Sequence, residues 1–243
     1  EFRRVLFRSC AVALAGLLHA SVSVPDGHVI TKSDASHVLG VQGDLSDLPV
    51  GTLDEACSKA LFARFGIPTS EERVVATVEE ARAAAQALGG CVALKILSAE
   101  ITHKTDVGGV ALNLSVEQVG ERLNVMSDVV FARTRTRPKR FLVQRMVADG
   151  IELILGMRRD ALGTAILLGM GGTLAELLKD TRLRMLPESG GLSEDAAIGM
   201  ARDLKCWALL DGYRGRAKAD VAALTRAVSA FSLMVARLGD RLV

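Results

Sequence analysis

Apolar residues recur at the three- and four-residue spacing of an amphipathic helix in five segments of the chain. Thr77, with Glu80 three positions later, forms the pattern of a helix capping box. Gly66 and the pair Gly89–Gly90 follow the first two segments and mark their ends. The predicted helices lie within residues 52–66, 77–90, 115–134, 192–205 and 220–239.

Short apolar runs bounded by turn residues predict strands between these helices. Helices and strands are mixed, without a strict strand–helix–strand repeat and without a P-loop. Residues 240–243 look like the approach to a further strand. The predicted strands lie within residues 67–76, 91–97, 110–114, 140–147, 151–160 and 164–172.

The two ends of the chain suggest a piece of a longer protein. Residues 1–9 read like a translated sequencing adapter, although with the apolar run behind them they superficially resemble a signal peptide. We interpret residues 10–22 as the last helix of a preceding domain. Residues 23–52 are rich in Gly, Asp and Ser without a sustained period, which is typical of a linker.

Composition narrows the class of protein. The chain has 243 residues, of which 49% are hydrophobic and 24% charged, as expected for a globular protein with a real core. A net charge of +2 and an aromatic content of 4% argue against nucleic acid as a partner, so the basic run 132–140 reads as a solvated loop. We find no transmembrane segment. Four scattered cysteines predict reduced thiols and a cytoplasmic protein.

The segment 101–114 gathers reactive side chains in one loop. His103, Lys104, Thr105 and Asp106 are consecutive, and Gly108–Gly109 follows. A histidine can attack a phosphoryl group with its free ring nitrogen, and a neighbouring lysine supplies positive charge. Alternatively, the histidine is an ordinary surface residue and the glycines only form a turn into the next strand.

Lys95 lies inside an otherwise apolar predicted strand. A buried unpaired ammonium is costly, so the side chain either faces solvent from an edge strand or binds a partner such as a phosphate.

Further candidates for ligand binding lie in the second half of the chain. Glu152 opens a predicted strand, and its carboxylate could accept hydrogen bonds from a ribose or face water. Gly171–Gly172 and Glu176 follow another strand, but glycine-rich turns are common. Asp211, Arg214 and Arg216 lie around two glycines near the end of the chain. Their charges suit either an anion-binding loop or a solvated turn.

Four of these segments, in this order and spacing, resemble the ATP-grasp half of ADP-forming acyl-CoA synthetases of the acetate–CoA ligase type. They are ALKILSAEITHKTDVGGVALNL, FLVQRMVADGIELILGMRRD, LLGMGGTLAELLKD and LLDGYRGR. The resemblance covers about residues 53–243. It implies an α+β, ATP-grasp fold with two subdomains, residues 53–140 and an incomplete 141–243, and the nucleotide in the cleft between them.

The resemblance also implies a reaction. The family interconverts acyl-CoA, ADP and phosphate with acid, CoA and ATP through an acyl phosphate and a phosphohistidine. His103 resembles the phosphoryl-accepting histidine, and Lys104, Thr105, Asp106 and the two glycines its mobile loop. The implied nucleotide-binding residues are Lys95, Gln144, Arg145, Met146, Val147, Glu152, Gly171, Gly172 and Glu176.

The chain departs from the family pattern at its ends. The family's late strand with Mg²⁺ ligands is missing, so the resemblance implies metal ligands beyond Val243 and no metal site within this fragment. Ala217 stands where relatives often have proline. The expected partners are CoA-binding and CoA-ligase domains of the same parent, a CoA thioester and a carboxylic acid, in an oligomeric parent. We expect the isolated fragment to be inactive.

Two other functions stay open at the level of the sequence. One is a different ATP-grasp carboxylate ligase, which passes an acyl phosphate to an amine or thiol and has no need of His103. The other is a nucleotide-binding regulatory module, as in a fused protein acetyltransferase.

Overall fold

The computed structural model describes residues 53–98, 101, 104–147, 150–172, 175–188 and 190–241. They fold as two compact units. The four-stranded unit contains residues 53–60 and 70–147, and the three-stranded unit contains residues 61–69 and 150–241. The expected linker and the segments before it lie outside the described residues.

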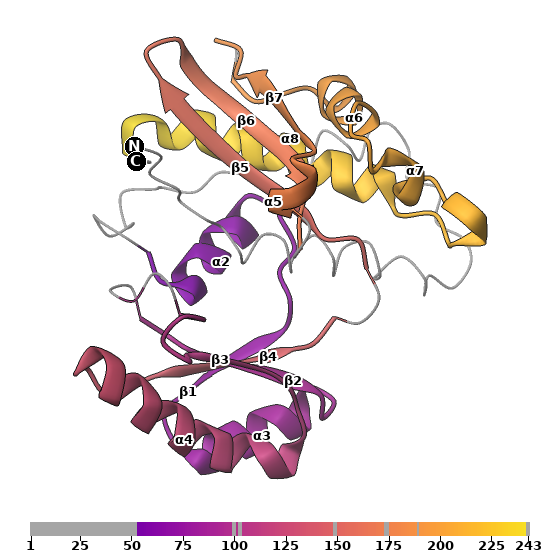
Figure 1. The fold of residues 1–243 in the computed structure, drawn as a ribbon. Coiled ribbons are helices and arrows are strands. Elements are labelled where there is room, and N and C mark those ends of the chain that lie inside the picture. Colours follow the sequence, from indigo (N-terminus) through magenta and orange to yellow (C-terminus); the bar gives the residue numbers. More distant parts are fainter. Residues whose placement is uncertain are drawn as a thin grey trace. The chain divides into compact units, whose positions relative to one another are not determined.

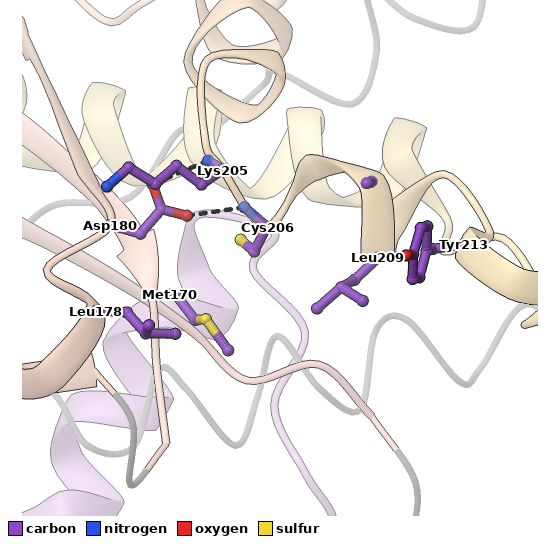
Figure 2. A pocket seen from close by; sticks show the side chains of 8 residues that line it. Met170, Leu178, Asp180, Lys205, Cys206, Leu209 and Tyr213 are labelled. Carbon is purple, nitrogen blue, oxygen red and sulfur yellow. Dashed lines mark hydrogen bonds between the residues drawn. The ribbon is translucent and has the colours of Figure 1, made fainter.

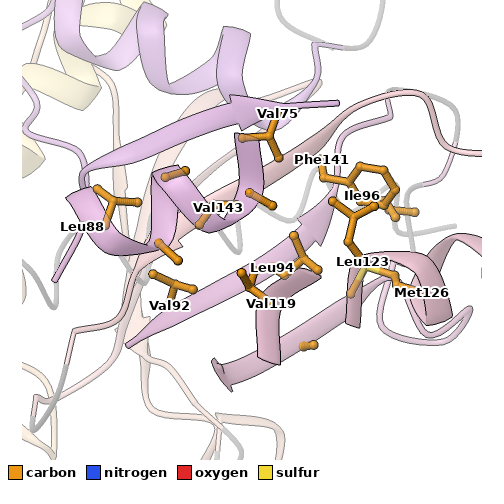
Figure 3. Close-up of a cluster of buried hydrophobic side chains, with 14 of the residues drawn as sticks. Val75, Leu88, Val92, Leu94, Ile96, Val119, Leu123, Met126, Phe141 and Val143 are labelled. Atoms are coloured by element: carbon orange, nitrogen blue, oxygen red, sulfur yellow. The ribbon is translucent and has the colours of Figure 1, made fainter. Parts of the chain in front are cut away.

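An antiparallel sheet in the order β1-β4-β2-β3 forms the four-stranded unit (Figure 1). Its strands are β1 (Glu72–Val75), β2 (Val92–Ile96), β3 (Val110–Leu114) and β4 (Phe141–Arg145). Helices α3 (Val78–Ala87) and α4 (Val116–Thr134) cover one face of this sheet. Their buried side chains meet those of the strands in one apolar cluster (Figure 3).

The three-stranded unit contains a second antiparallel sheet in the order β5-β6-β7. Its strands are β5 (Leu153–Asp160), β6 (Gly163–Met170) and β7 (Thr181–Met185). Its helices are α5 (Ala175–Leu178), α6 (Glu194–Arg202), α7 (Trp207–Leu210) and α8 (Val221–Leu238), and short 3-10 turns are η2 (Tyr213–Gly215) and η3 (Gly239–Arg241). The division between the units falls within helix α2 (Glu55–Arg64).

Helix α8 is long and apolar enough to cross a membrane by length and composition alone, whereas the sequence analysis predicts no transmembrane segment. In the structure it is a core helix. Leu224, Val228 and Phe231 are almost inaccessible to solvent, and the Phe231 ring lies 6.4 Å from that of Phe62. The apolar side chains on this face of α8 are therefore part of the core of the three-stranded unit.

The structure differs from the sequence expectation in its short elements and in its division. The predicted elements do not include strand β7 or the short helices α5 and α7. The division at residue 140 differs from the one observed, because β4 pairs with β1 and β2 and so belongs to the first unit. At the end of the described residues Gly239–Arg241 form a 3-10 turn, and the further strand that residues 240–243 look like approaching stays a prediction.

The predicted capping box at the start of α3 is confirmed. The Thr77 hydroxyl accepts the Glu80 N–H at 3.1 Å, and the Glu80 carboxylate accepts the Thr77 N–H at 3.4 Å. We expect Thr77→Ala to lower the free energy of unfolding by about 1 kcal/mol, because the Glu80 N–H in the first turn of the helix would lose its hydrogen-bond acceptor. Urea denaturation measures it. The exposed Thr136→Ala is the control, and an equal loss in both variants would contradict the cap.

Candidate functional site

Lys95 occupies the interior of the four-stranded unit. Strand β2 lies between β4 and β3, so the alternative of an edge strand is wrong. The Lys95 side chain is 13% exposed, and its ammonium lies 2.7 Å from Oε1 of Glu55. The partner that a buried lysine requires is thus a carboxylate from the first turn of α2.

Glu55 binds three lysines at once. Its Oε1 also lies 3.2 Å from the Lys59 ammonium, and its Oε2 lies 3.6 Å from that of Lys104. Lys59 forms a second ion pair with Glu72 on β1. We call these five residues the Glu55 cluster; three lysines and two glutamates give it one surplus positive charge.

The charges of the Glu55 cluster shift the acidity of its members. Burial alone would raise the pKa of Glu55, but the nearby ammonium groups of Lys95 and Lys59 outweigh it and hold that pKa at about 2. Burial lowers the pKa of Lys95, and the Glu55 carboxylate opposes this shift. Burial raises the pKa of Glu72. Glu55 is therefore an anion at any physiological pH.

Residues 104–109 form a closed turn beside the cluster. The Gly109 N–H donates to the Lys104 carbonyl at 2.7 Å, and the guanidinium of Arg133 on α4 donates to the Asp106 carbonyl at 2.6 Å. A Cβ at Gly109 would lie 2.7 Å from Cδ1 of Ile96, so this position needs glycine for close packing. Movement of the loop stays a prediction.

His103 itself lies outside the described residues, and its role as phosphoryl acceptor stays a prediction. Lys104, the first described residue after His103, pairs with Glu55, so this part of the loop lies beside the Glu55 cluster. Thr105 participates in the turn by accepting the Gly108 N–H at 3.1 Å with its carbonyl.

The predicted nucleotide-binding segment from Gln144 to Val147 begins inside β4. Gln144 is 1% exposed and donates from Nε2 to the Ser70 hydroxyl at 2.5 Å, while its buried Oε1 has no partner among the described residues. The N–H groups of Arg145 and Met146 donate to the carbonyls of Glu71 and Cys91. A nucleotide base would thus have to meet other backbone groups of this segment, which include those of Val147.

Two of the predicted nucleotide-binding elements in the three-stranded unit lie next to each other: Glu152 and the pair Gly171–Gly172. The Gly171 N–H donates to the Glu152 carbonyl at 2.7 Å. A Cβ at Gly172 would lie 3.0 Å from Oε2 of Glu152, and a Cβ at Gly171 would lie 3.1 Å from the Glu152 backbone. The glycines therefore allow the turn after β6 to pass close to the residue that precedes β5. Glu176 lies exposed on α5.

The predicted anion loop is an exposed turn around η2. Asp211 pairs with Lys218 at 2.8 Å, and the Arg214 guanidinium lies 5.3 Å from the centre of the Tyr213 ring. Arg216 is exposed. The first two side chains thus have partners within the protein, which favours a solvated turn; anion binding stays a prediction.

One cavity of the three-stranded unit contains none of the predicted site residues (Figure 2). It has a volume of about 290 Å³ and a mostly apolar wall. Buried Asp180 accepts the backbone N–H groups of Lys205 and Cys206 at its edge. No sequence motif predicts this cavity, because its lining residues are scattered along the chain: Met170, Leu178, Asp180, Lys205, Cys206, Ala208, Leu209 and Tyr213.

The described residues fit phosphate groups and metal ions differently. The surplus positive charge and the buried lysines of the Glu55 cluster suit the phosphates of a nucleotide. Within the described ranges, no group of three or more His, Cys, Asp or Glu residues could hold a metal ion. The described residues therefore do not by themselves fit Mg²⁺.

Comparison with known proteins matches residues 48–240 to an ATP-grasp domain family. Acetate–CoA ligase [ADP-forming] I subunit beta of Pyrococcus furiosus is 32% identical over 71% of this chain and 74% of that protein. Acetate–CoA ligase [ADP-forming] I of Archaeoglobus fulgidus is 37% identical over 66% of this chain. The chain covers 23% of that protein, so it spans about a quarter of its length.

Solved structures show the same likeness. Dinucleotide forming acetyl-coenzyme A synthetase 1 of Ca. Korarchaeum cryptofilum, in complex with coenzyme A and Ca-AMPCP, is 33% identical. It has a TM-score of 0.68, with 78% of this chain and 80% of the other covered. The same protein with Mg-AMPPCP, and with its phosphohistidine segment pointing towards the nucleotide-binding site, has a TM-score of 0.61 at 33% identity, with 78% and 79% covered. The chain therefore belongs to the ATP-grasp domain family and is homologous to the ATP-grasp part of ADP-forming acetate–CoA ligases.

Proposed function

We propose that this chain is the ATP-binding part of an NDP-forming acyl-CoA synthetase. The Glu55 cluster carries the proposal. It places two lysines of the predicted site, Lys95 and Lys104, on one carboxylate within a buried group that has a surplus positive charge. Phosphoryl transfer depends mainly on positioning and charge neutralisation, which these ammonium groups supply.

The proposed reaction proceeds in three reversible steps. Phosphate attacks the acyl carbon, the C–S bond breaks, and CoA leaves as the thiol. The imidazole of His103 or of a partner domain then attacks the phosphorus of the acyl phosphate, and the carboxylate leaves as the P–O bond breaks. Finally a terminal oxygen of ADP takes the phosphoryl group from the histidine. The phosphohistidine segment of the Korarchaeum relative supports this route over direct transfer to an amine.

In this scheme the chain's residues bind and orient the nucleotide. Lys95 and Lys104 contact phosphate oxygens. Gln144 and the backbone that follows it bind the base, and Glu152 with Gly171–Gly172 contacts the ribose or phosphates. A divalent ion on the phosphates would neutralise charge, as the Mg-AMPPCP complex of the relative suggests. We assign no step to it, because the described residues do not form its site.

The surroundings are part of the proposal. CoA-binding and CoA-ligase domains of the same parent, fused or separate, would supply the CoA thioester and the acid, and the parent would be an oligomer. The cytoplasm suits the free thiols of Cys57, Cys91 and Cys206.

A thermal-shift titration with ADP and ATP, with and without Mg²⁺, tests the proposal. We expect the nucleotide at 100 times its Kd to stabilise the chain by about 2.7 kcal/mol. Lys95→Met should abolish that shift, because it removes a buried phosphate ligand, and the exposed Lys139→Met should retain it. A folded wild-type chain without any shift, or an unchanged shift in Lys95→Met, would contradict nucleotide binding at this site.

A further inference from the structure

Glu55 occupies the position in which the lysines of the cluster converge. Its two oxygens contact three ammonium groups: Oε1 lies 2.7 Å from Lys95 and 3.2 Å from Lys59, and Oε2 lies 3.6 Å from Lys104. The Glu55 side chain is 8% exposed. One anion with oxygens shared among several cations is also the arrangement of a bound phosphoryl group.

The three lysines depend on Glu55 to different degrees. Lys59 also pairs with Glu72, and its ammonium lies 3.4 Å from the Ser70 hydroxyl. For Lys95 and Lys104, Glu55 is the ion-pair partner that the described residues provide. An incoming anion could thus take over Lys95 and Lys104 while Glu55 keeps Lys59, and no buried charge would be left without a partner.

We propose that Glu55 is a positioning residue that stands in for a phosphate: it holds Lys95 and Lys104 together in the empty site and releases them to the nucleotide's phosphates. The inference rests on the proposed function and adds regulation of the same site. Its consequence is competition within the molecule, because phosphate oxygens must displace a carboxylate that is already bound. Nucleotide affinity is thereby set below what the lysines alone would give.

Glu72 offers a matched control for this competition. It is the second glutamate of the cluster and is half-buried, so Glu72→Gln removes an acidic side chain from the same cluster as Glu55→Gln does. Its carboxylate contacts Lys59 but forms no ion pair with Lys95 or Lys104 within the described part of the chain. A difference between the two variants therefore reports the contacts that Glu55 makes with Lys95 and Lys104.

The test is isothermal titration of the whole 243-residue chain with ADP at mildly acidic pH, because burial lowers the pKa of Lys95. We expect Glu55→Gln to bind ADP about tenfold more tightly than the wild type, and Glu72→Gln by less than about threefold. Glu55→Asp keeps the charge but shortens the side chain by one methylene. It should also tighten binding, and it serves if Glu55→Gln fails to fold.

The pH profile separates a positioning role from a merely structural one. The charged groups around Lys95 are Glu55 and Lys59 on α2, Lys104 on its loop and Glu72 on β1. Without Glu55, burial lowers the pKa of Lys95 further. ADP affinity of Glu55→Gln should therefore fall as the pH rises above neutral, and the wild-type affinity should fall less over the same range.

Each result decides between the two proposals. Equal tightening in Glu55→Gln and Glu72→Gln, or weaker binding by Glu55→Gln at mildly acidic pH, would overturn the role of Glu55 and leave the nucleotide site intact. No binding by any of the folded proteins would overturn both.

Discussion

Replacing Phe141 with alanine is expected to lower the free energy of unfolding by about 3–5 kcal/mol. The side chain is 2% exposed and belongs to the apolar cluster between the four-stranded sheet and its two helices (Figure 3). Strand β4 is an inner strand, and Phe141 pairs with Val75 of β1 and Ile96 of β2. The alanine would leave a cavity that strands fixed on both sides cannot close.

The matched control is Phe131→Ala on helix α4. This ring is 38% exposed and lies 5.0 Å from the guanidinium of Arg137, outside the buried cluster. We expect it to cost less than about 1 kcal/mol, since it loses partial burial and one cation–π contact. Urea denaturation followed by circular dichroism measures both. Similar losses at the two positions would show that β4 is not an inner strand of this core.

Local patterns accounted for most elements of the fold. The capping residues Thr77, Ser115 and Ser193 each precede a helix, and their side chains accept the backbone N–H that a cap requires. Such signals act within four residues of the chain, so the sequence alone displays them. The apolar run of β2 was recognisable for a similar reason, because four of its five residues are buried.

Strand β7 was missed because its sequence lacks a buried face. In Thr181–Met185, two arginines alternate with two apolar residues that stay exposed, Leu183 at 51% and Met185 at 53%. It is an edge strand that pairs only with β6 within the described sheet. Register with a distant neighbour, rather than its own hydrophobic pattern, makes this segment a strand.

Only part of the site could be predicted from the sequence, because its central ion pair joins residues that lie far apart in the chain. Lys95 is conspicuous as a charge within an apolar strand. Its partner Glu55 lies 40 positions earlier in the chain, at the start of a helix, where acidic residues are ordinary. Only the fold shows that this carboxylate, rather than solvent, meets the ammonium.

Acid titration should show how much stability the Glu55 carboxylate contributes. The folded-state pKa of Glu55 is about 2, compared with an ordinary value of 4.5. A carboxyl group with a depressed pKa stabilises the fold above its unfolded-state pKa, and this contribution is lost as the pH falls through the folded-state value. Between pH 4.5 and about 2, the wild type should therefore lose about 3 kcal/mol more than Glu55→Gln does.

Comparison of the two proteins isolates this carboxylate. Glu72 has the opposite sign: burial raises its pKa, so the folded state takes up its proton first and gains stability as the pH falls. Glu72→Gln therefore serves to subtract that contribution. Parallel profiles for the wild type and Glu55→Gln would mean that Glu55 is not the anion holding the lysines together, and the proposed competition with phosphate would lose its physical basis.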